Sequence, residues 1–303
     1  MVWLPMAMPA LLRTPAAARL ARVLAAALAV VVAAVAAVEA VSATPSAGAV
    51  QRRYAVRAAT ETSSNWAGYS AVTPDGAPAS TFTSATGTWR QPVATCSLES
   101  AGSASAVWVG LGGYDLNAPA LEQIGTDADC DNSGKPVYYA WYELVPAPPV
   151  NLKFAIRPGD TITASVNYAG GVVWLQLKNR TSGVVFNKKV PVASPDLTSA
   201  DWIVEAPSSC SRFSCRPVPL TNFGSVSISR IATIANEHPG TLTDTAWRAA
   251  QIQLVPHSGN GFFPGEERGV NQTSSTAGTT KPLATEDGRG FTVSWAATAT
   301  PAG

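Results

Sequence analysis

Short runs of alternating apolar and polar residues recur along most of the chain, and Gly, Pro, Asn or Asp bounds most of them. A period of two places the apolar side chains on one face of a β-strand. The runs predict strands at Thr81–Trp89, Ser105–Leu111, Val137–Leu144, Thr161–Tyr168, Val172–Leu177, Val184–Val190, Trp202–Glu205, Ser225–Ile231 and Phe291–Trp295. No long helical pattern follows residue 43.

The turns between the runs support an all-β fold. Gly170-Gly171 separates two of the predicted strands and indicates a hairpin, and the segment from Asn179 to Gly183 predicts the next turn. Regular short strands of this kind are typical of a sandwich or a barrel. No internal repeat or low-complexity linker divides the chain after the N-terminal region, so we expect one domain from residue 63 to residue 303.

The N-terminal segment has the pattern of a targeting signal. An arginine-containing stretch precedes the unbroken apolar run Val23–Val38, and Val41-Ser42-Ala43 then fits a small-x-small cleavage site. The run is shorter than the about 20 residues that a spanning helix needs. We therefore expect residues 1–43 to be a secretory signal peptide, and the protein to be secreted without remaining on a membrane. An uncleaved membrane anchor is the alternative. Residues 44–62 would form a short pro-segment or a linker.

Composition limits the kinds of partner that the protein can bind and indicates the redox state of its cysteines. Charged residues make up 14% and the net charge is +1, so no basic field for nucleic acid exists. The chain has an even number of cysteines, which in an exported protein predicts two disulfides. Closure of a local loop between Cys210 and Cys215 would leave Cys96 to pair with Cys130, although three connectivities are open. A zinc site is the weaker alternative, because no CxxC pair occurs and the two histidines are far apart.

Several hydrolytic signatures do not occur. The sequence has no GxSxG elbow, no HExxH motif and no Asp-Thr-Gly or Asp-Ser-Gly motif. With the cysteines paired, no thiolate nucleophile remains. If the chain is a hydrolase, its general base is then a carboxylate, and no metal or cofactor is needed.

Five segments carry a family resemblance in their order along the chain. They are Ser64–Tyr69, Val107–Gly113, Glu122–Asp127, Tyr139–Glu143 and Ala200–Glu205. Together they resemble the glutamic peptidases known as eqolisins. The resemblance implies a bent β-sandwich of two stacked antiparallel sheets, similar to concanavalin A-like lectins and glucanases. It also implies a secreted acid endopeptidase that acts on protein or peptide substrates, and we expect it to be a monomer.

The resemblance assigns roles to individual residues. The glutamate that closes the motif Ala-Asp-Trp-Ile-Val-Glu maps to Glu205, and the glutamine of Gln-x-Gly-x-Asp maps to Gln123. These two form the expected catalytic pair. Trp66 and Trp108 match tryptophans that line the active cleft of the family.

Two acidic residues complete the expected site. Glu143 and Asp127 are further candidates for substrate binding. The sequence departs from the fungal members at Gly112, where they carry an aspartate. If that aspartate tunes the catalytic glutamate, Asp115 or Asp127 would have to replace it.

The residue types suit peptide hydrolysis. A carboxylate can take a proton from water and return it to the leaving amine, and an amide N–H can stabilise the developing oxyanion. Along a strand, Asp201, Ile203 and Glu205 share one face and Trp202 lies on the other, in the expected core. Gln123 would come from a neighbouring strand.

Two other functions fit the same sandwich. A glycoside hydrolase would use Asp201 and Glu205 as its carboxylate pair, although four strand residues separate their α-carbons by about 13 Å. A lectin-like carbohydrate-binding module would use the cleft tryptophans and would leave Gln123 and Glu205 without a joint role.

Overall fold

The computed structural model describes residues 60–115, 120–210, 215–256, 258–259, 272–273 and 277–297. All of them belong to one compact unit. The expected signal peptide, and the expected pro-segment up to residue 59, lie outside the described residues. No helix in the described part of the chain is long and apolar enough to cross a membrane.

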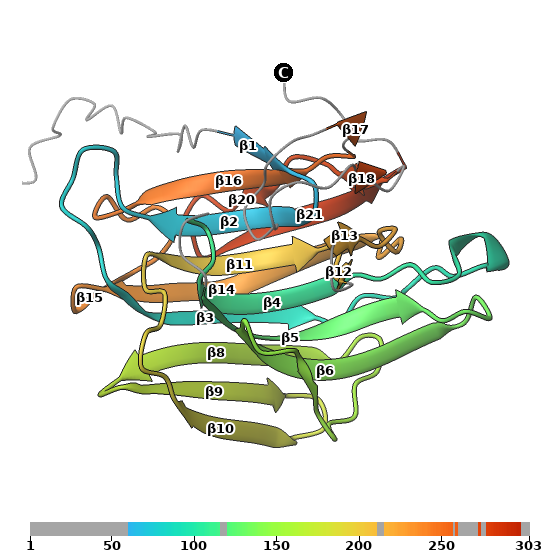
Figure 1. Ribbon diagram of the computed structural model, residues 1–303, viewed down its shortest axis with the longest axis horizontal. Helices are drawn as coiled ribbons and strands as arrows, with labels where there is room; N and C mark the ends of the chain where they lie inside the picture. Colours follow the sequence, from blue (N-terminus) through green and yellow to red (C-terminus); the bar gives the residue numbers. More distant parts are fainter. Residues whose placement is uncertain are drawn as a thin grey trace, which may run out of the picture. The chain divides into compact units, whose positions relative to one another are not determined.

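Two sheets form a sandwich, and Figure 1 views both layers together. The eight-stranded sheet has the order β1-β16-β2-β11-β4-β5-β6-β7. Its strands are β1 (Thr60–Ser63), β2 (Trp66–Val72), β4 (Ala106–Gly112), β5 (Leu121–Cys130), β6 (Pro136–Val145), β7 (Val150–Asn151), β11 (Ser199–Glu205) and β16 (Arg248–Leu254). All neighbours in it are antiparallel except β1 and β16.

The second sheet has the order β10-β9-β8-β3-β14-β21-β19, and β15 and β20 pair beside this path. Its strands are β3 (Phe82–Arg90), β8 (Thr161–Ala169), β9 (Val172–Asn179), β10 (Val185–Pro191), β14 (Ser225–Ala235), β15 (His238–Gly240), β19 (Gly278–Thr279), β20 (Leu283–Ala284) and β21 (Gly290–Ala296). Two small hairpins and one 3₁₀ turn complete the described elements: β12 (Ser208–Cys210) with β13 (Cys215–Pro217), β17 (Ser258–Gly259) with β18 (Gln272–Thr273), and η1 (Leu98–Ser100).

The two sheets differ in how many of their faces are buried. In β8, β9 and β14 buried residues alternate with partly or fully exposed ones, because one face meets the core and the other meets solvent. In β2, β4 and β5 every residue is buried. The central strands of the eight-stranded sheet are therefore covered on both faces, which removes the alternation of buried and exposed residues from them.

This difference accounts for three strands that the pattern did not identify, although the pattern did identify β4, which is also fully buried. All nine strands predicted from the sequence are present, with ends shifted by a few residues. The hairpin at Gly170-Gly171 joins β8 to β9 as expected. The alternation did not identify β2, β5 and β16, whose residues are almost all buried. The expected all-β sandwich is confirmed.

The main core lies between the sheets. It includes Trp202, Trp89, Phe82 and Phe291, each almost fully buried. Burying one large aromatic side chain contributes roughly 2–3 kcal/mol, so these residues dominate the stability of the sandwich. Trp202 lies in this core, as the strand period predicted.

The N-terminal strand is bound to the sheet by its side chains as well as its backbone. β1 pairs in parallel with β16. Glu61 forms an ion pair with Arg248 at 3.0 Å and accepts a hydrogen bond from the Tyr114 hydroxyl at 2.6 Å. The strand begins at Thr60, so it crosses the boundary expected after residue 62.

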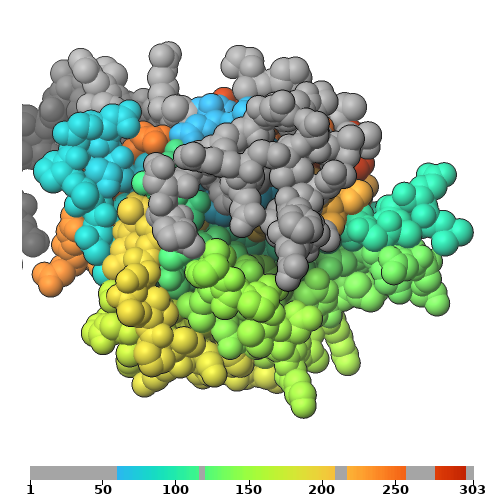
Figure 2. Space-filling view, in the orientation of Figure 1, coloured from blue at the N-terminus to red at the C-terminus, as the bar shows by residue number. Residues whose placement is uncertain are grey.

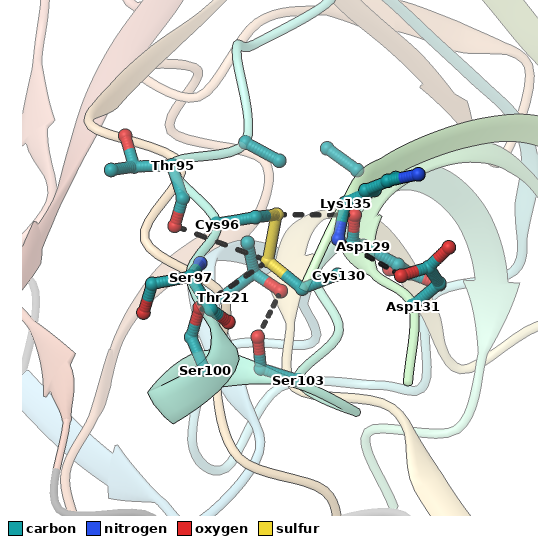
Figure 3. Close-up of a disulfide and its surroundings, with 12 residues drawn as sticks. Thr95, Cys96, Ser97, Ser100, Ser103, Asp129, Cys130, Asp131, Lys135 and Thr221 are labelled. Carbon is teal, nitrogen blue, oxygen red and sulfur yellow. Dashed lines mark hydrogen bonds between the residues drawn. A yellow bond between two sulfur atoms is a disulfide. The ribbon is translucent and has the colours of Figure 1, made fainter. Parts of the chain in front are cut away.

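One disulfide joins the segment that follows β3 to the end of β5. Cys96 and Cys130 are bonded, as the loop-closure argument predicted (Figure 3). The segment from Cys96 through η1 projects from one end of the sandwich (Figures 1 and 2). Cys210 and Cys215 are backbone partners in the β12–β13 ladder, but their side chains lie outside the described residues.

Candidate active site

The outer face of the eight-stranded sheet carries the candidate residues. Antiparallel pairing aligns them in rows across the strands. Glu205 pairs with Trp66 on β2 and with Ala106 on β4, and Ala106 pairs with Asp127 on β5. Two same-face positions along, Gly110 pairs with Gln123, which pairs with Glu143 on β6. The expected site residues therefore share one face.

A second hydrophobic cluster lies between these rows. It contains Trp66, Trp108, Trp141 and Ile203, all of which face away from the main core. The rings of Trp66 and Trp108 meet edge to face, with centroids 5.0 Å apart. Trp66 and Trp108 are 1% and 0% exposed, so both are packed beneath the surface of this face.

Two glycines make room for the Trp108 indole. A β-carbon at Gly125 would lie 2.6 Å from Cβ of Trp108, and one at Gly110 would lie 3.0 Å from its Cζ3. These are the glycines of the Trp-Val-Gly and Gln-x-Gly motifs. The spacing of both motifs thus reflects one packing requirement, which is a large ring lying on a sheet.

Trp108 and Asn65 hold the carboxylate of Glu205. The indole Nε1–H of Trp108 donates to Glu205 Oε2 at 2.6 Å, and Nδ2 of Asn65 donates to Oε1 at 3.3 Å. Ser63 donates its hydroxyl to Asn65 Oδ1, which leaves the Asn65 amide nitrogen for the carboxylate. Each oxygen of Glu205 therefore has a donor, and part of the side chain remains exposed.

The surroundings favour the protonated form of Glu205. Burial raises the pKa of Glu205 to about 8, the Trp108 hydrogen bond acts against this, and the negative charge of Glu143 raises the pKa further. Hydrogen bonding from Trp66 and Asn65 lowers it. Glu205 is thus a stronger base than an exposed glutamate, and it becomes ionised at a higher pH.

Gln123 lies on β5, which β4 separates from the strand of Glu205. Gln123 was expected on a strand next to that of Glu205, but β5 is the second strand from β11. Gln123 is 4% exposed, its Nε2 donates to Glu143 Oε2 at 2.7 Å, and its Oε1 has no hydrogen-bond partner among the described residues. This amide has one N–H and its carbonyl oxygen left for a ligand.

Three polar side chains of this face, those of Glu205, Gln123 and Glu143, interact with one another. Glu143 acts electrostatically on Glu205, although β5 and β4 lie between their strands. Gln123 lies on one of these intervening strands and binds Glu143 directly. Glu205, Gln123 and Glu143 thus form one electrostatically connected group.

A second acidic group adjoins Glu205. Asp127 accepts a hydrogen bond from Trp141 Nε1, and Asp129 accepts one from the Tyr139 hydroxyl at 2.7 Å. Burial raises the pKa of Asp127 well above its usual range, and the charges of Asp129 and Glu205 raise it further. Burial also raises the pKa of Asp129 to about 6.

The structure accounts for the glycine where the fungal family members have an aspartate. Gly112 has φ +81°, and a β-carbon there would lie 2.4 Å from Cβ of Asp196. Asp196 accepts a hydrogen bond from the backbone N–H of Gly113 at 2.8 Å and is 6% exposed. A carboxylate from another segment therefore occupies the space beside Gly112.

Asp201 is placed differently from the carboxylate of a glycosidase pair. It is 0% exposed, and Ser199 donates to its Oδ2 at 2.9 Å. Burial raises its pKa to about 8. Asp201 is thus enclosed on the face where Glu205 is partly exposed, and this disfavours the glycosidase alternative.

The sequence pattern indicated no role for several residues of this site. Asn65 belongs to a quoted motif, and its amide next to a conspicuous tryptophan was the available signal. Tyr139 begins the segment Tyr139–Glu143, and Asp129 follows two residues after the segment Glu122–Asp127. Asp196 had no signal, because it lies in a connection far from Gly112 in sequence. Among the described residues, no group of three or more His, Cys, Asp or Glu has the arrangement of a metal site.

Known proteins share this sequence pattern and fold. The model of the peptidase A4 family matches residues 64–257. A solved structure of scytalido-glutamic peptidase with a peptide-based transition-state analogue is 24% identical, with a TM-score of 0.58 over 77% of this chain and 98% of that chain. The eqolisin SCP-B, in complex with the tripeptide Ala-Ile-His, is 23% identical, with a TM-score of 0.55 over the same shares. No curated protein sequence matches.

The fold and the matching family define an all-β hydrolase of peptide bonds. The chain belongs to the peptidase A4 family, the glutamic peptidases or eqolisins. It is a glutamic endopeptidase.

Proposed function

We propose that the protein is a secreted acid endopeptidase in which Glu205 is the general base and Gln123 stabilises the oxyanion. The observation that carries this proposal is that the side chains of Glu205 and Gln123 lie on one face of the sheet and keep atoms available for a ligand. Glu205 is partly exposed and held by donors at both oxygens, and Gln123 has an unpartnered carbonyl oxygen among the described residues.

The chemistry follows from these atoms. Glu205 takes a proton from a water molecule, whose oxygen forms a bond to the peptide carbonyl carbon while the C=O electron pair moves to the oxygen. The free N–H of Gln123 donates to that oxyanion. The carbonyl then re-forms, the C–N bond breaks, and Glu205 returns its proton to the leaving amine. The products are a carboxylic acid and an amine.

The remaining candidates support this pair. Trp108 holds Glu205, and Trp66 packs against Trp108, so both rings would support the pair from beneath the surface. Asp127 and Glu143 border the pair, and Asp127 would contact a peptide beside it. The substrate is a protein or peptide chain, the enzyme acts as a monomer, and its N-terminal signal directs its secretion.

The raised pKa of Glu205 determines the pH range in which the proposed general base is ionised. Each pH unit below this pKa lowers the ionised fraction about tenfold. We therefore expect the protein to act in mildly rather than strongly acidic surroundings.

Denatured casein is the test substrate, with the secreted protein and its Glu205→Gln variant assayed from pH 2 to pH 8. Removal of the general base should lower kcat by about 10²- to 10⁴-fold, because the amide cannot take the proton. The wild-type activity should resist pepstatin and chelators. Absence of proteolysis at every pH, after any pro-segment has been removed, would refute the proposal.

A matched assay on β-glucans tests the glycosidase alternative, and retention on insoluble glucan without hydrolysis tests the lectin alternative. Geometry gives a further check. A water molecule should bind within about 3.5 Å of both the Glu205 carboxylate and the Gln123 amide.

A further inference from the structure

Glu143 and Gln123 form a hydrogen-bonded pair near Glu205. They are direct cross-strand partners of β6 and β5, and Nε2 of Gln123 donates to Oε2 of Glu143 at 2.7 Å. The length is that of a charge-assisted N–H···O⁻ bond. Glu143 is partly buried and Gln123 is almost fully buried, so bulk water competes little with the hydrogen bond between them.

This contact decides the orientation of the amide. The two ends of a glutamine amide have nearly the same shape but opposite polarity. Burial raises the pKa of Glu143, and the hydrogen bond from Gln123 lowers it. In its ionised form this carboxylate can only accept a hydrogen bond, so the –NH₂ end faces Glu143 and the carbonyl oxygen points away from it. That oxygen has no partner in the described part of the chain, and an unpaired buried acceptor destabilises the folded state. A water O–H would complete it.

Glu143 also acts on the general base. Two carboxyls interact electrostatically with Glu205, namely Glu143 and Asp127. The donors that face Glu205 are Trp108, Trp66 and Asn65. The repulsion from Glu143 makes Glu205 harder to ionise and a stronger base once it is ionised. One side chain thus influences both members of the proposed pair.

We propose that Glu143 is a positioning residue for peptide hydrolysis, which fixes the Gln123 amide with its carbonyl oxygen and second N–H free for the attacking water and the oxyanion. This inference rests on the proposed function. It assigns Glu143 a role through Gln123 and Glu205 rather than through contact with the substrate.

The Glu143→Gln variant tests the proposal kinetically. A glutamine at position 143 has a similar shape but can donate as well as accept, so both orientations of Gln123 become available. We expect kcat to fall about 10- to 100-fold, with KM within about threefold of wild type. The acid limb of kcat/KM should move to lower pH, because the charge that raises the pKa of Glu205 has been removed.

Glu122→Gln is the matched control. Glu122 is also a buried carboxyl of the same part of the sheet, but it lies on the opposite face of β5 from Gln123. Its replacement should leave both kcat and the acid limb unchanged under conditions where the protein is folded. A loss of kcat in Glu143→Gln without movement of the acid limb would indicate a merely structural role and overturn the proposal. An unchanged kcat would overturn it as well.

A readout that needs no activity separates this proposal from the proposed function. In protein labelled with [¹⁵N]glutamine, the side-chain –NH₂ signals of Gln123 should titrate with Glu143, also in the Glu205→Gln background. The titration should disappear in the Glu143→Gln variant. Absence of the titration in both backgrounds would overturn the positioning role. If the titration is present but Glu205→Gln leaves proteolysis intact, the proposed function fails and the contact remains.

Discussion

Trp108 donates its indole N–H to the carboxylate of Glu205 at 2.6 Å, across the pairing of β4 and β11. The tryptophan is fully buried, and the glycines at 110 and 125 leave the space in which its ring lies. The hydrogen bond favours the ionised carboxylate, against the burial that favours its protonated form. Trp108 is therefore a determinant of when Glu205 becomes a base.

Trp108→Phe should raise the acid limb of kcat/KM by about one to two pH units. Loss of a hydrogen bond to a charged group costs about 1.5–3 kcal/mol, which here disfavours the ionised form of Glu205. The measurement is the pH dependence of kcat/KM on a small peptide.

Trp202→Phe is the control for that change. Trp202 is equally buried but lies in the main core, where its Nε1 donates to the carbonyl oxygen of Thr86. It should lower the melting temperature without moving the acid limb. The same shift in both variants would contradict the assigned role of Trp108.

The folded state should be more stable in acid than at neutral pH. Burial raises the pKa of Glu122 and of Asp201 to about 8, so the folded protein keeps protons that the unfolded chain releases above about pH 4. The free energy of unfolding should therefore be highest below about pH 4 and fall as the pH rises to about 8. Each group adds a slope of up to about 1.4 kcal/mol per pH unit.

Urea unfolding at a series of pH values measures this slope. Glu122→Gln, which is neutral at every pH, should make the dependence shallower between pH 5 and pH 8. A stability that rises with pH over this range would be incompatible with the buried, protonated carboxyls.

Gly112→Ala should destabilise the protein by about 2–4 kcal/mol. The backbone at Gly112 has φ +81°, and the added methyl group would overlap Asp196. Both the left-handed conformation and the overpacking cost free energy. The nearest atoms to the added methyl group are Cβ and the backbone oxygen of Asp196, which a shorter side chain at 196 would not remove. Thermal unfolding of Gly112→Ala measures the loss, and a melting temperature equal to that of wild type would contradict the predicted overlap.

Replacing Cys96 and Cys130 by serine should cost roughly 3–4 kcal/mol of stability. The disulfide closes a loop with a sequence separation of 34, and it restricts the unfolded chain accordingly. It also ends β5, the strand of Gln123 and Asp127. Urea unfolding under non-reducing conditions is the measurement, and a loss below about 1 kcal/mol would mean that the loop is already constrained without the bond.

The class of fold and the main candidate residues could be predicted from the amino-acid pattern alone. Alternation identified strands such as β8, β9 and β14, because one face of their sheet meets solvent. It also placed Trp202 in the core and Glu205 on the other face, since side chains alternate along a strand. The ordered motifs identified the family, which the match over residues 64–257 confirms.

The contacts that hold the site depend on how the strands are arranged in space. Strand order brought Asn65 and Trp108 to Glu205, and Glu143 to Gln123, because partners on different strands have no fixed spacing in sequence. β2 and β5 are covered on both faces, so they lack the alternation of buried and exposed residues. The same covering shields the site that they carry. The pKa of Glu205 likewise depends on burial and on a distant charge, which are properties of packing that a local pattern does not contain.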